Sequence, residues 1–522
     1  MRQAELLIVG LLVAVAGLSA LARWLSLPYP IVLVIGGALF GFVPGVPEVK
    51  LDPAVVLVIF LPPLLYAAAF FANLNEIRAN LRGVALTSVG LVLVTMVAVA
   101  VAAHALIHGL PWAAAFALGA VVSPTDPLAG AAIMRRLGLP RRLVSAVEAE
   151  GLFNDATALV AYRVAVKAAV VSGSFSLADA GLSFLAGAAG GVAIGLIVGR
   201  VIAAIRERTA DTQVSITISL LSGYAAFVPA DAVGASGVLA AVTTGIYMGI
   251  KGPSIIPART RLQGLMVWDI LDFLINAALF VLVGFQLRTV VNGLSGRSVE
   301  TLAGYAIAVS AVVIVMRLVW FFTVPYLIRL LDRRPSQRAR RVGPQVRLVI
   351  AWSGMRGAVS LAAALALPLK LPQRNLLIFI TFVVILSTLV VQGLSLPALI
   401  RWLGIDDDGS EDEEEVRARL VATKAALSQL DALEEEDWTR NETVERMRGL
   451  YEYRKRRFAA RAGKIEDDGY EDRSLSYQQM VQSVLAAQRE ALVQLRNEGG
   501  LSNEVMNRVV RELDLEESRL EI

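Results

Sequence analysis

A small set of ionisable residues lies inside long apolar stretches of this sequence, and these residues are the first candidates for chemistry. They are Asp126, Glu150, Asp155, Arg317 and Arg356. Carboxylate oxygens bind hard cations and also accept protons. If the apolar stretches cross a membrane, a charge inside them is costly, so each of these residues needs a partner or a function.

Asp126 lies in a segment that predicts an interrupted helix, Ser123-Pro124-Thr125-Asp126-Pro127. Each proline removes a backbone donor and disfavours helical geometry in the residue before it. Irregular backbone at membrane depth is tolerated only where it lines a cavity or is buried in protein. We therefore expect the freed carbonyl groups and the Asp126 carboxylate to form an oxygen site for a small alkali cation. A proline kink with a hydrogen-bonded aspartate is the structural alternative.

The second acidic segment is Glu150-Gly151-Leu152-Phe153-Asn154-Asp155. Helical spacing places Glu150 and Asn154 on one face, and it places Gly151 beside Asp155, where the glycine leaves space. Burial disfavours the charged form of this carboxylate, and a nearby Asp126 disfavours it further. Asp155 is therefore expected to hold either a proton or a cation, which is what coupled exchange requires. A salt bridge with a purely structural role is the alternative.

Glu150 has a different expected role, because Arg317 also lies deep in an apolar stretch and needs a counter-charge. No other acidic residue has so suitable a depth, so we predict that the two residues pair. A buried ion pair adds little net stability but is costly to break by removing one partner. A structural role for Glu150 and direct contact with the ion both stay open.

Arg356 lies in Ser353-Gly354-Met355-Arg356-Gly357, where the glycines mark a second weak point in a span. Its positive charge is suited to compensate the negative charge of carboxylates or of carbonyl groups at helix ends. The alternative is that the Arg356 side chain packs against the helices and extends its charge toward the membrane interface. Four other charged residues are left outside the site. Arg163 and Lys167 are expected to reach the outer interface or a local acid, and Asp269 and Asp272 to lie near the inner interface.

Composition places the chain in a membrane. Hydrophobic residues make up 56% of the sequence, charged residues 18%, and the mean hydropathy is +0.62. About 20 apolar residues span the hydrocarbon core, and runs of this length predict an all-α protein with about thirteen transmembrane helices. The expected spans are residues 5–22, 29–46, 51–72, 83–109, 112–134, 143–172, 176–204, 212–230, 235–251, 262–290, 300–331, 348–370 and 375–403. Glycines 187, 191, 195 and 199 lie nearly on one face and predict close helix packing.

Cysteine is absent and the only histidines are His104 and His108, which excludes disulfides, cysteine catalysis and a histidine metal site. No cofactor is expected. The pI near 9.3 does not indicate a nucleic-acid partner, because the basic residues lie in short loops.

Alternate loops between the spans differ in charge, and the basic set is predicted to be cytoplasmic. This places the amino terminus outside the cell membrane and the carboxyl tail inside. The sequence thus predicts two domains, a transmembrane domain over 1–403 and a charged helical tail over 404–522. The tail begins with the acidic run Asp406 to Glu415, and its binding partner is unknown. The basic loops carry Arg23, Arg78, Arg82, Arg135, Arg136, Arg141, Arg142, Arg206, Arg208, Lys251, Arg259, Arg261, Arg333, Arg334, Arg338, Arg340, Arg341 and Arg347, and the opposite loops carry Lys50, Arg288, Arg297, Lys370 and Arg374.

These motifs resemble the monovalent cation/proton antiporter family, in its bacterial and animal Na+/H+ exchanger branch. The matching segments are Leu61-Pro62-Pro63, Thr125-Asp126-Pro127, Glu150 with Asn154-Asp155, Arg317, Met355-Arg356-Gly357-Ala358 and Gln392-Gly393-Leu394. The resemblance covers residues 1 to about 403.

The resemblance implies two inverted repeats with two broken crossing helices, a homodimer in the lipid membrane, and elevator-like motion that exposes Asp155 to each side in turn. It implies that Asp155 binds Na+ and carries the proton, assisted by Asp126 and Thr125, while Glu150 pairs with Arg317. Asn154 is typical of the electroneutral branch. Gly151 stands where some relatives place a serine hydroxyl, which leaves the cation affinity open.

Other functions remain as alternatives. A cation channel also suits carboxylates at mid-depth, but it would pass current without proton counterflow. A K+/H+ antiporter would use the same residues, and transport of Li+ or K+ beside Na+ stays open. A sensor that signals through the tail would depend on residues 404–522.

Overall fold

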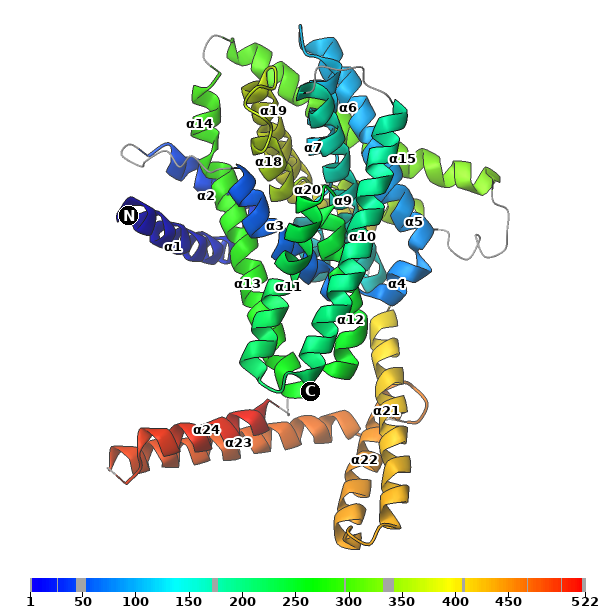
Figure 1. The fold of residues 1–522 in the computed structure, drawn as a ribbon. Helices are drawn as coiled ribbons and strands as arrows, with labels where there is room; N and C mark the ends of the chain where they lie inside the picture. The colour runs from blue at the N-terminus through cyan, green and yellow to red at the C-terminus, as the bar shows by residue number, and fades with distance from the viewer. Residues whose placement is uncertain are drawn as a thin grey trace. The chain divides into compact units, whose positions relative to one another are not determined.

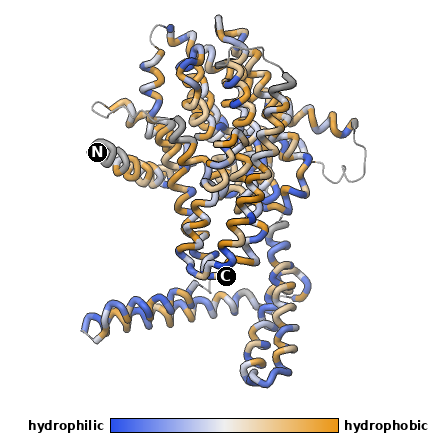
Figure 2. The backbone as a smooth tube through the Cα atoms, in the orientation of Figure 1, coloured by the Kyte–Doolittle hydropathy of each residue, from blue (hydrophilic) through white to orange (hydrophobic). Residues whose placement is uncertain are grey.

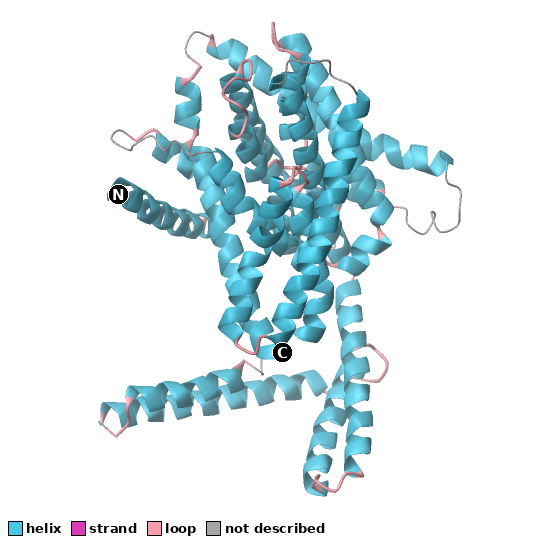
Figure 3. Cartoon of the chain, viewed as in Figure 1, coloured by secondary structure: helices cyan, strands magenta, loops and turns pink. Residues whose placement is uncertain are grey.

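The computed structural model describes residues 2–25, 27–43, 53–170, 177–294, 297–331, 342–405, 409–466, 468–498 and 500–518. Every regular element in these ranges is a helix (Figure 3). The chain forms two compact units, Met1–Asp407 and Asp408–Ile522. Several residues used in the charge analysis lie outside the described ranges, namely Lys50, Arg333, Arg334, Arg338, Arg340, Arg341 and the first part of the acidic run, residues 406–408.

We group the helices of the first unit, which Figure 1 labels, into two sets by their contacts. We call the first set the scaffold helices: α1 (Arg2–Trp24), α2 (Tyr29–Gly41), α3 (Pro53–Phe70), α10 (Leu177–Arg208), α11 (Thr212–Ala232), α12 (Gly237–Ile255) and α13 (Ala258–Phe285). Within this set α12 packs against α3, α10 and α11, while α13 packs against α1 and α2.

The second set, the core helices, carries the residues singled out from the sequence. It comprises α5 (Leu81–Ala85), the π-helix η1 (Leu86–Leu91), α6 (Val92–Leu106), α7 (Trp112–Val122), α8 (Pro127–Arg136), α9 (Arg141–Val170), α15 (Val299–Leu331), α17 (Pro344–Trp352), α18 (Ala358–Leu365), α19 (Arg374–Ser387), the π-helix η2 (Thr388–Gln392) and α20 (Gly393–Leu403). Two short helices, α4 (Leu74–Ala79) and α14 (Leu287–Asn292), lie between the sets along the chain.

The helices of the first unit are long and apolar enough for a multi-pass membrane protein. Among the described residues, 7 helices meet the length and hydropathy of a membrane span, and shorter apolar helices cover Val9–Trp24, Tyr29–Gly41 and Val58–Phe70. Apolar residues dominate this part of the chain (Figure 2). The count of about thirteen spans and the inverted repeats stay predictions.

The glycine face of α10 packs as predicted against α12. A Cβ atom at Gly195 would come within 2.6 Å of the Ala240 carbonyl oxygen, and one at Gly199 within 3.1 Å of the Tyr247 side chain. Gly187 has open space at this position, but its carbonyl oxygen accepts a hydrogen bond from Ser236 N at 2.9 Å. Small residues therefore let the two backbones approach closely.

Both interruptions predicted from proline and glycine are present. The helix that starts at Trp112 ends at Val122, and α8 begins at Pro127 with proline in its first turn, where no donor is needed. The second interruption separates Trp352, the last residue of α17, from Ala358, the first residue of α18. Four short helices thus replace two long ones, and their ends lie inside the unit.

The second unit is helical, as the helix-favouring composition of the tail predicts. Its elements are α21 (Ser410–Glu434), α22 (Asn441–Arg461), α23 (Tyr470–Asn497) and α24 (Asn503–Glu517). Contacts join α21 to α22 and α23 to α24. Ion pairs support both contacts, since Arg448 binds Asp431 and Glu434, and Arg489 binds Asp514 and Glu517.

Candidate ion-binding site

The two helix interruptions contact each other directly. The backbone N–H of Asp126, in the first interruption, donates a hydrogen bond to the Met355 carbonyl oxygen in the second, at 2.8 Å. The Asp126 carboxylate lies so close to Gly357 that a Cβ atom at Gly357 would collide with it. Glycine is therefore required at this position for the two segments to meet.

The charges near the crossing match the helix ends that they face. Carbonyl groups at a helix C-terminus carry partial negative charge, and N–H groups at an N-terminus carry partial positive charge. At the end of α7, Arg356 Nη1 donates to the Ser123 carbonyl oxygen at 2.8 Å. At the end of α17, Arg317 donates to the Ala351 and Ile350 carbonyl oxygens, each at 3.0 Å.

The helix start in the crossing carries the opposite charge. Asp126 is the N-terminal cap of α8, and its Oδ1 accepts a hydrogen bond from Leu128 N at 2.9 Å. A carboxylate at this position satisfies an unpaired backbone donor and interacts favourably with the helix dipole. Both buried arginines and the half-buried Asp126 therefore have a structural reason for their depth.

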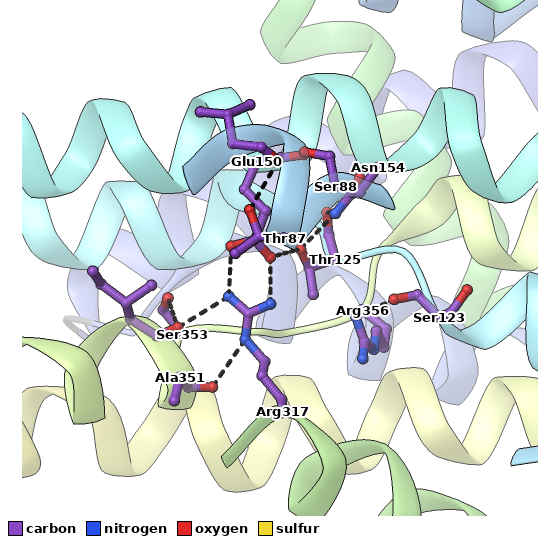
Figure 4. A network of polar contacts seen from close by, with 12 residues as sticks. Thr87, Ser88, Ser123, Thr125, Glu150, Asn154, Arg317, Ala351, Ser353 and Arg356 are labelled. Atoms are coloured by element: carbon purple, nitrogen blue, oxygen red, sulfur yellow. Dashed lines mark hydrogen bonds and ion pairs between the residues drawn. The ribbon is translucent and has the colours of Figure 1, made fainter. Parts of the chain in front are cut away.

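The ion pair predicted between Glu150 and Arg317 is present (Figure 4). Arg317 Nη2 lies 3.1 Å from Glu150 Oε2, and Nη1 contacts Oε1. Only 3% of Glu150 and 2% of Arg317 is exposed to solvent, so both charges are withdrawn from water. Ser88, in η1, donates to the Glu150 carbonyl oxygen at 3.2 Å.

Thr125 and Asn154 extend this network toward the first interruption (Figure 4). Thr125 Oγ1 donates to Glu150 Oε1 at 3.1 Å. Asn154 Nδ2 lies 2.7 Å from Thr125 Oγ1 and 3.2 Å from the Thr125 carbonyl oxygen. The hydroxyl, amide, carboxylate and guanidinium groups therefore hold the backbone of residue 125 in place.

A cavity of about 380 Å³ reaches the crossing from one side. Thr125, Asp126, Gly151 and Asp155 line it, whereas Glu150, Asn154, Arg317 and Arg356 do not. The structure thus divides the predicted site residues into two groups. One group faces a cavity large enough for an ion and water, and the other forms a buried network behind it.

Asp155 differs from the other buried acids in its surroundings. No described residue donates a hydrogen bond to its carboxylate, and the charges that act on it most are those of Asp126 and Arg356. A carboxylate that faces a cavity without a fixed donor can bind a proton or a cation. Within the described chain, no group of three or more His, Cys, Asp or Glu side chains converges as a resident metal site.

The cavity opens on the side of the basic loops. Its lining includes Arg135 and Glu148, which form an ion pair and whose side chains are 65% and 37% exposed. These residues lie near the end of α8 and the start of α9, which the short loop between Arg136 and Arg141 connects. In this structure the site is therefore accessible from the side that the charge pattern predicts to be cytoplasmic.

Two acids that the sequence analysis left outside the site line this cavity. Asp269 and Asp272 were expected only near the inner interface, but both belong to the cavity wall that α13 forms. With Asn276 they follow a spacing of i, i+3 and i+7, which places them on one helix face. That spacing in an otherwise apolar span was the signal that could have identified them. Arg163, by contrast, pairs with a local acid as expected, namely Asp231.

The two π-helices, which the sequence analysis did not predict, also reach the site. Ser88 of η1 contacts Glu150, and Thr388 of η2 accepts a hydrogen bond from Arg356 N at 3.1 Å. An extra residue in a helical turn often occurs at functional positions, because it redirects side chains and backbone groups.

These features define a class of protein: a multi-pass membrane protein with interrupted helices and carboxylates at a central cavity, an arrangement suited to ion transport. Comparison with known sequences gives the family. The sodium/hydrogen exchanger transmembrane family matches residues 10–402, and the chain belongs to this family of antiporters, which are not enzymes.

Relatives match most or nearly all of the chain. An uncharacterised Na+/H+ exchanger of Mycobacterium tuberculosis is 36% identical over 523 residues, which are 98% of this chain and 95% of the relative. A Na+/H+ antiporter of Aphanothece halophytica is 30% identical over 433 residues, 82% of this chain and 80% of the relative. The fold is similar to that of the sodium proton antiporter MjNhaP1 from Methanocaldococcus jannaschii, with a TM-score of 0.56, 18% identity, and coverage of 77% of this chain and 100% of that one.

Proposed function

We propose that this protein exchanges Na+ for H+ across the cell membrane, one for one and without net charge movement. The observation that carries the proposal is the environment of Asp155, a carboxylate that lines the cavity beside Asp126 and accepts no hydrogen bond from the described residues. Na+ and H+ are the cargo and compete for this carboxylate. No resident cofactor takes part.

Asp126 and the Thr125 carbonyl group complete the cation site in this proposal. Both residues line the cavity, and carboxylate and carbonyl oxygens are hard ligands. Asn154 and Glu150 act through Thr125, because their hydrogen bonds fix its backbone and hydroxyl group. Arg317 and Arg356 support the crossing from behind, through the carbonyl groups at the ends of α17 and α7.

Alternating access requires the site to face each side of the membrane in turn. We propose that the core helices move past the scaffold helices in an elevator-like manner and carry Asp155 with them. The cavity is consistent with this, because α3 and α13 of the scaffold form one wall and α8, α9 and α18 of the core form the other.

The wider organisation follows the same proposal. Residues 1–403 form the antiporter domain, with about thirteen spans in two inverted repeats, and residues 404–522 form a cytoplasmic tail. The amino terminus lies outside the cell membrane, and two copies of the chain form a homodimer in the lipid bilayer.

The test is ion exchange by the purified full chain in liposomes. The liposomes hold a preformed pH gradient and a pH-sensitive dye, and Na+, Li+ or K+ is added outside. Electroneutral exchange predicts that Na+ collapses the gradient equally well when valinomycin and K+ clamp the membrane potential at zero. The K+/H+ alternative predicts the strongest response to K+. A cation current without proton movement would contradict exchange and support a channel.

A further inference from the structure

One face of α13 carries a polar stripe into the cavity. Asp269, Asp272 and Asn276 line the cavity together, while neighbouring residues such as Ile270 and Met266 are apolar and exposed on the outer side of the unit. Three residues at i, i+3 and i+7 extend over about 10 Å of helix. Asp269 is exposed, Asp272 half-buried and Asn276 buried, so the stripe leads from the mouth inward.

The carboxylate of Asp272 has no compensating cation. At the mouth, Glu148 is paired with Arg135 and the two charges largely cancel. Neither Asp272 nor Asp269 forms an ion pair with any described residue. Asn276 lies beside Asp272, since its Nδ2 donates to the Asp272 backbone carbonyl at 2.9 Å and its amide also interacts with the Asp272 carboxylate. Both residues line the cavity.

Asp272 is also close enough to Asp126 for the two charges to interact. Like charges that face one cavity repel each other, and a cation between them relieves the repulsion. The free energy gained by a cation at the site therefore includes a contribution from Asp272, although this residue is not among the motifs of the interrupted helices.

The two carboxylates belong to different sets of helices. Asp272 lies on α13, which packs against α1 and α2 of the scaffold. Asp126 caps α8, and Asp155 lies on α9, in the core. Any movement of the core past the scaffold changes the distance from Asp272 to the site, whereas the distance between Asp126 and Asp155 is kept.

We propose that Asp272 is a side-specific affinity residue, which strengthens cation binding only while the site faces the cavity seen here. Its ligand is a hard monovalent cation, held by Asp155 and Asp126 and attracted by Asp272 across the cavity. When the site faces the opposite side of the membrane, Asp272 remains on α13 of the scaffold, and its contribution to the free energy of cation binding is lost. This inference rests on the proposed exchange with elevator-like motion.

The experiment measures the KM for Na+ from each side of the membrane. Right-side-out and everted vesicles from cells that express the full chain are compared at alkaline pH, where protons compete weakly. Because the chain has no cysteine, a single cysteine at the cavity residue Ser145, probed with an impermeant maleimide, identifies the vesicle face on which the cavity opens.

Asp272→Asn should raise the KM about tenfold on the cavity side, equivalent to about 1.4 kcal/mol, and leave the KM on the opposite side and the maximal rate unchanged. Asp272→Glu keeps the charge and should restore the KM on the cavity side. Glu207→Gln removes an exposed scaffold charge that does not line the cavity, and it should change neither KM. Size-exclusion chromatography of each variant confirms that it is folded.

Equal shifts on both sides, or no shift on either side, would overturn the side-specific role of Asp272 while exchange itself stands. Failure of the proposed function has a different signature. If Asp155→Asn retains Na+/H+ exchange in the same vesicles, the assignment of the site is wrong whatever Asp272 does.

Discussion

Two acidic residues on α9, Glu150 and Asp155, have opposite environments although they are less than two helical turns apart. Glu150 is buried, paired with Arg317 and hydrogen-bonded by Thr125. Asp155 faces the cavity and accepts no hydrogen bond from the described residues. Two carboxyl groups in the same helix can therefore have different roles, structural for Glu150 and in transport for Asp155. The difference comes from the groups that surround each carboxylate, because the carboxylates themselves are chemically alike.

The helix geometry of α9 explains this separation. Asn154 lies one turn after Glu150, and both face the buried network, whereas Gly151 lies one turn before Asp155, and both line the cavity. One face is fixed by hydrogen bonds and cannot release its charge without a large cost. The other face keeps its carboxylate available for exchange of ligands.

The strongest test of this contrast removes the charge at Asp155. Asp155→Asn should abolish Na+-driven proton movement in liposomes, because the amide can neither carry the proton nor attract the cation. The side chain forms no hydrogen bond with the described residues, so the unfolding temperature should stay close to that of the wild type. The dye assay and a thermal unfolding curve check the two statements. Retained exchange in a folded Asp155→Asn protein would contradict the role given to this residue.

The buried network should respond in the opposite way, through stability. Arg317→Met leaves the Glu150 carboxylate buried without its cation, and such a loss costs about 3–5 kcal/mol. We expect a large fall in the unfolding temperature in detergent. The double variant Arg317→Met with Glu150→Gln removes both charges and should recover part of the stability. If Arg317→Met unfolds like the wild type, the pair does not support the fold.

Local sequence signals predicted much of this arrangement. The prolines around Asp126 and the glycines around Arg356 indicated both interruptions, because these residues change the backbone wherever they occur. The pairing of Glu150 and Arg317 followed from the scarcity of other buried charges.

Other features depended on packing between distant segments and could not be predicted in this way. The contact of Arg356 with the Ser123 carbonyl oxygen requires the two interruptions to cross at a particular register. The orientation of α13 about its axis, which depends on its packing against several other helices, decides that Asp272 lines the cavity. The turns of η1 and η2 have no clear local signal in the sequence.

A moderate effect is expected where the two interruptions meet. A methyl group at Gly357 would collide with the Asp126 carboxylate, so Gly357→Ala must displace the carboxylate or separate the segments. Overpacking of this kind costs about 1–3 kcal/mol, and the KM for Na+ should rise by about tenfold or more. Gly304→Ala in α15, where no atom lies within 4 Å of an added Cβ, is the matched control and should behave like the wild type. An unchanged KM in Gly357→Ala would show that Asp126 is not held in place by the crossing.

The smallest effect is expected at Gly151, on the cavity face of α9. An added Cβ would lie 2.5 Å from the Pro127 ring, so the first turn of α8 must shift. The cost is partly offset because alanine favours a helix interior over glycine by about 1 kcal/mol. The atoms nearest to the added methyl group belong to Pro127 and not to Asp126, so Gly151→Ala should change the KM for Na+ by only about two- to threefold, with Gly181→Ala in α10 as the control in open space. If Gly151→Ala loses exchange as completely as Asp155→Asn, the cavity face of α9 tolerates no displacement. Asp155 would then be positioned as tightly as Glu150.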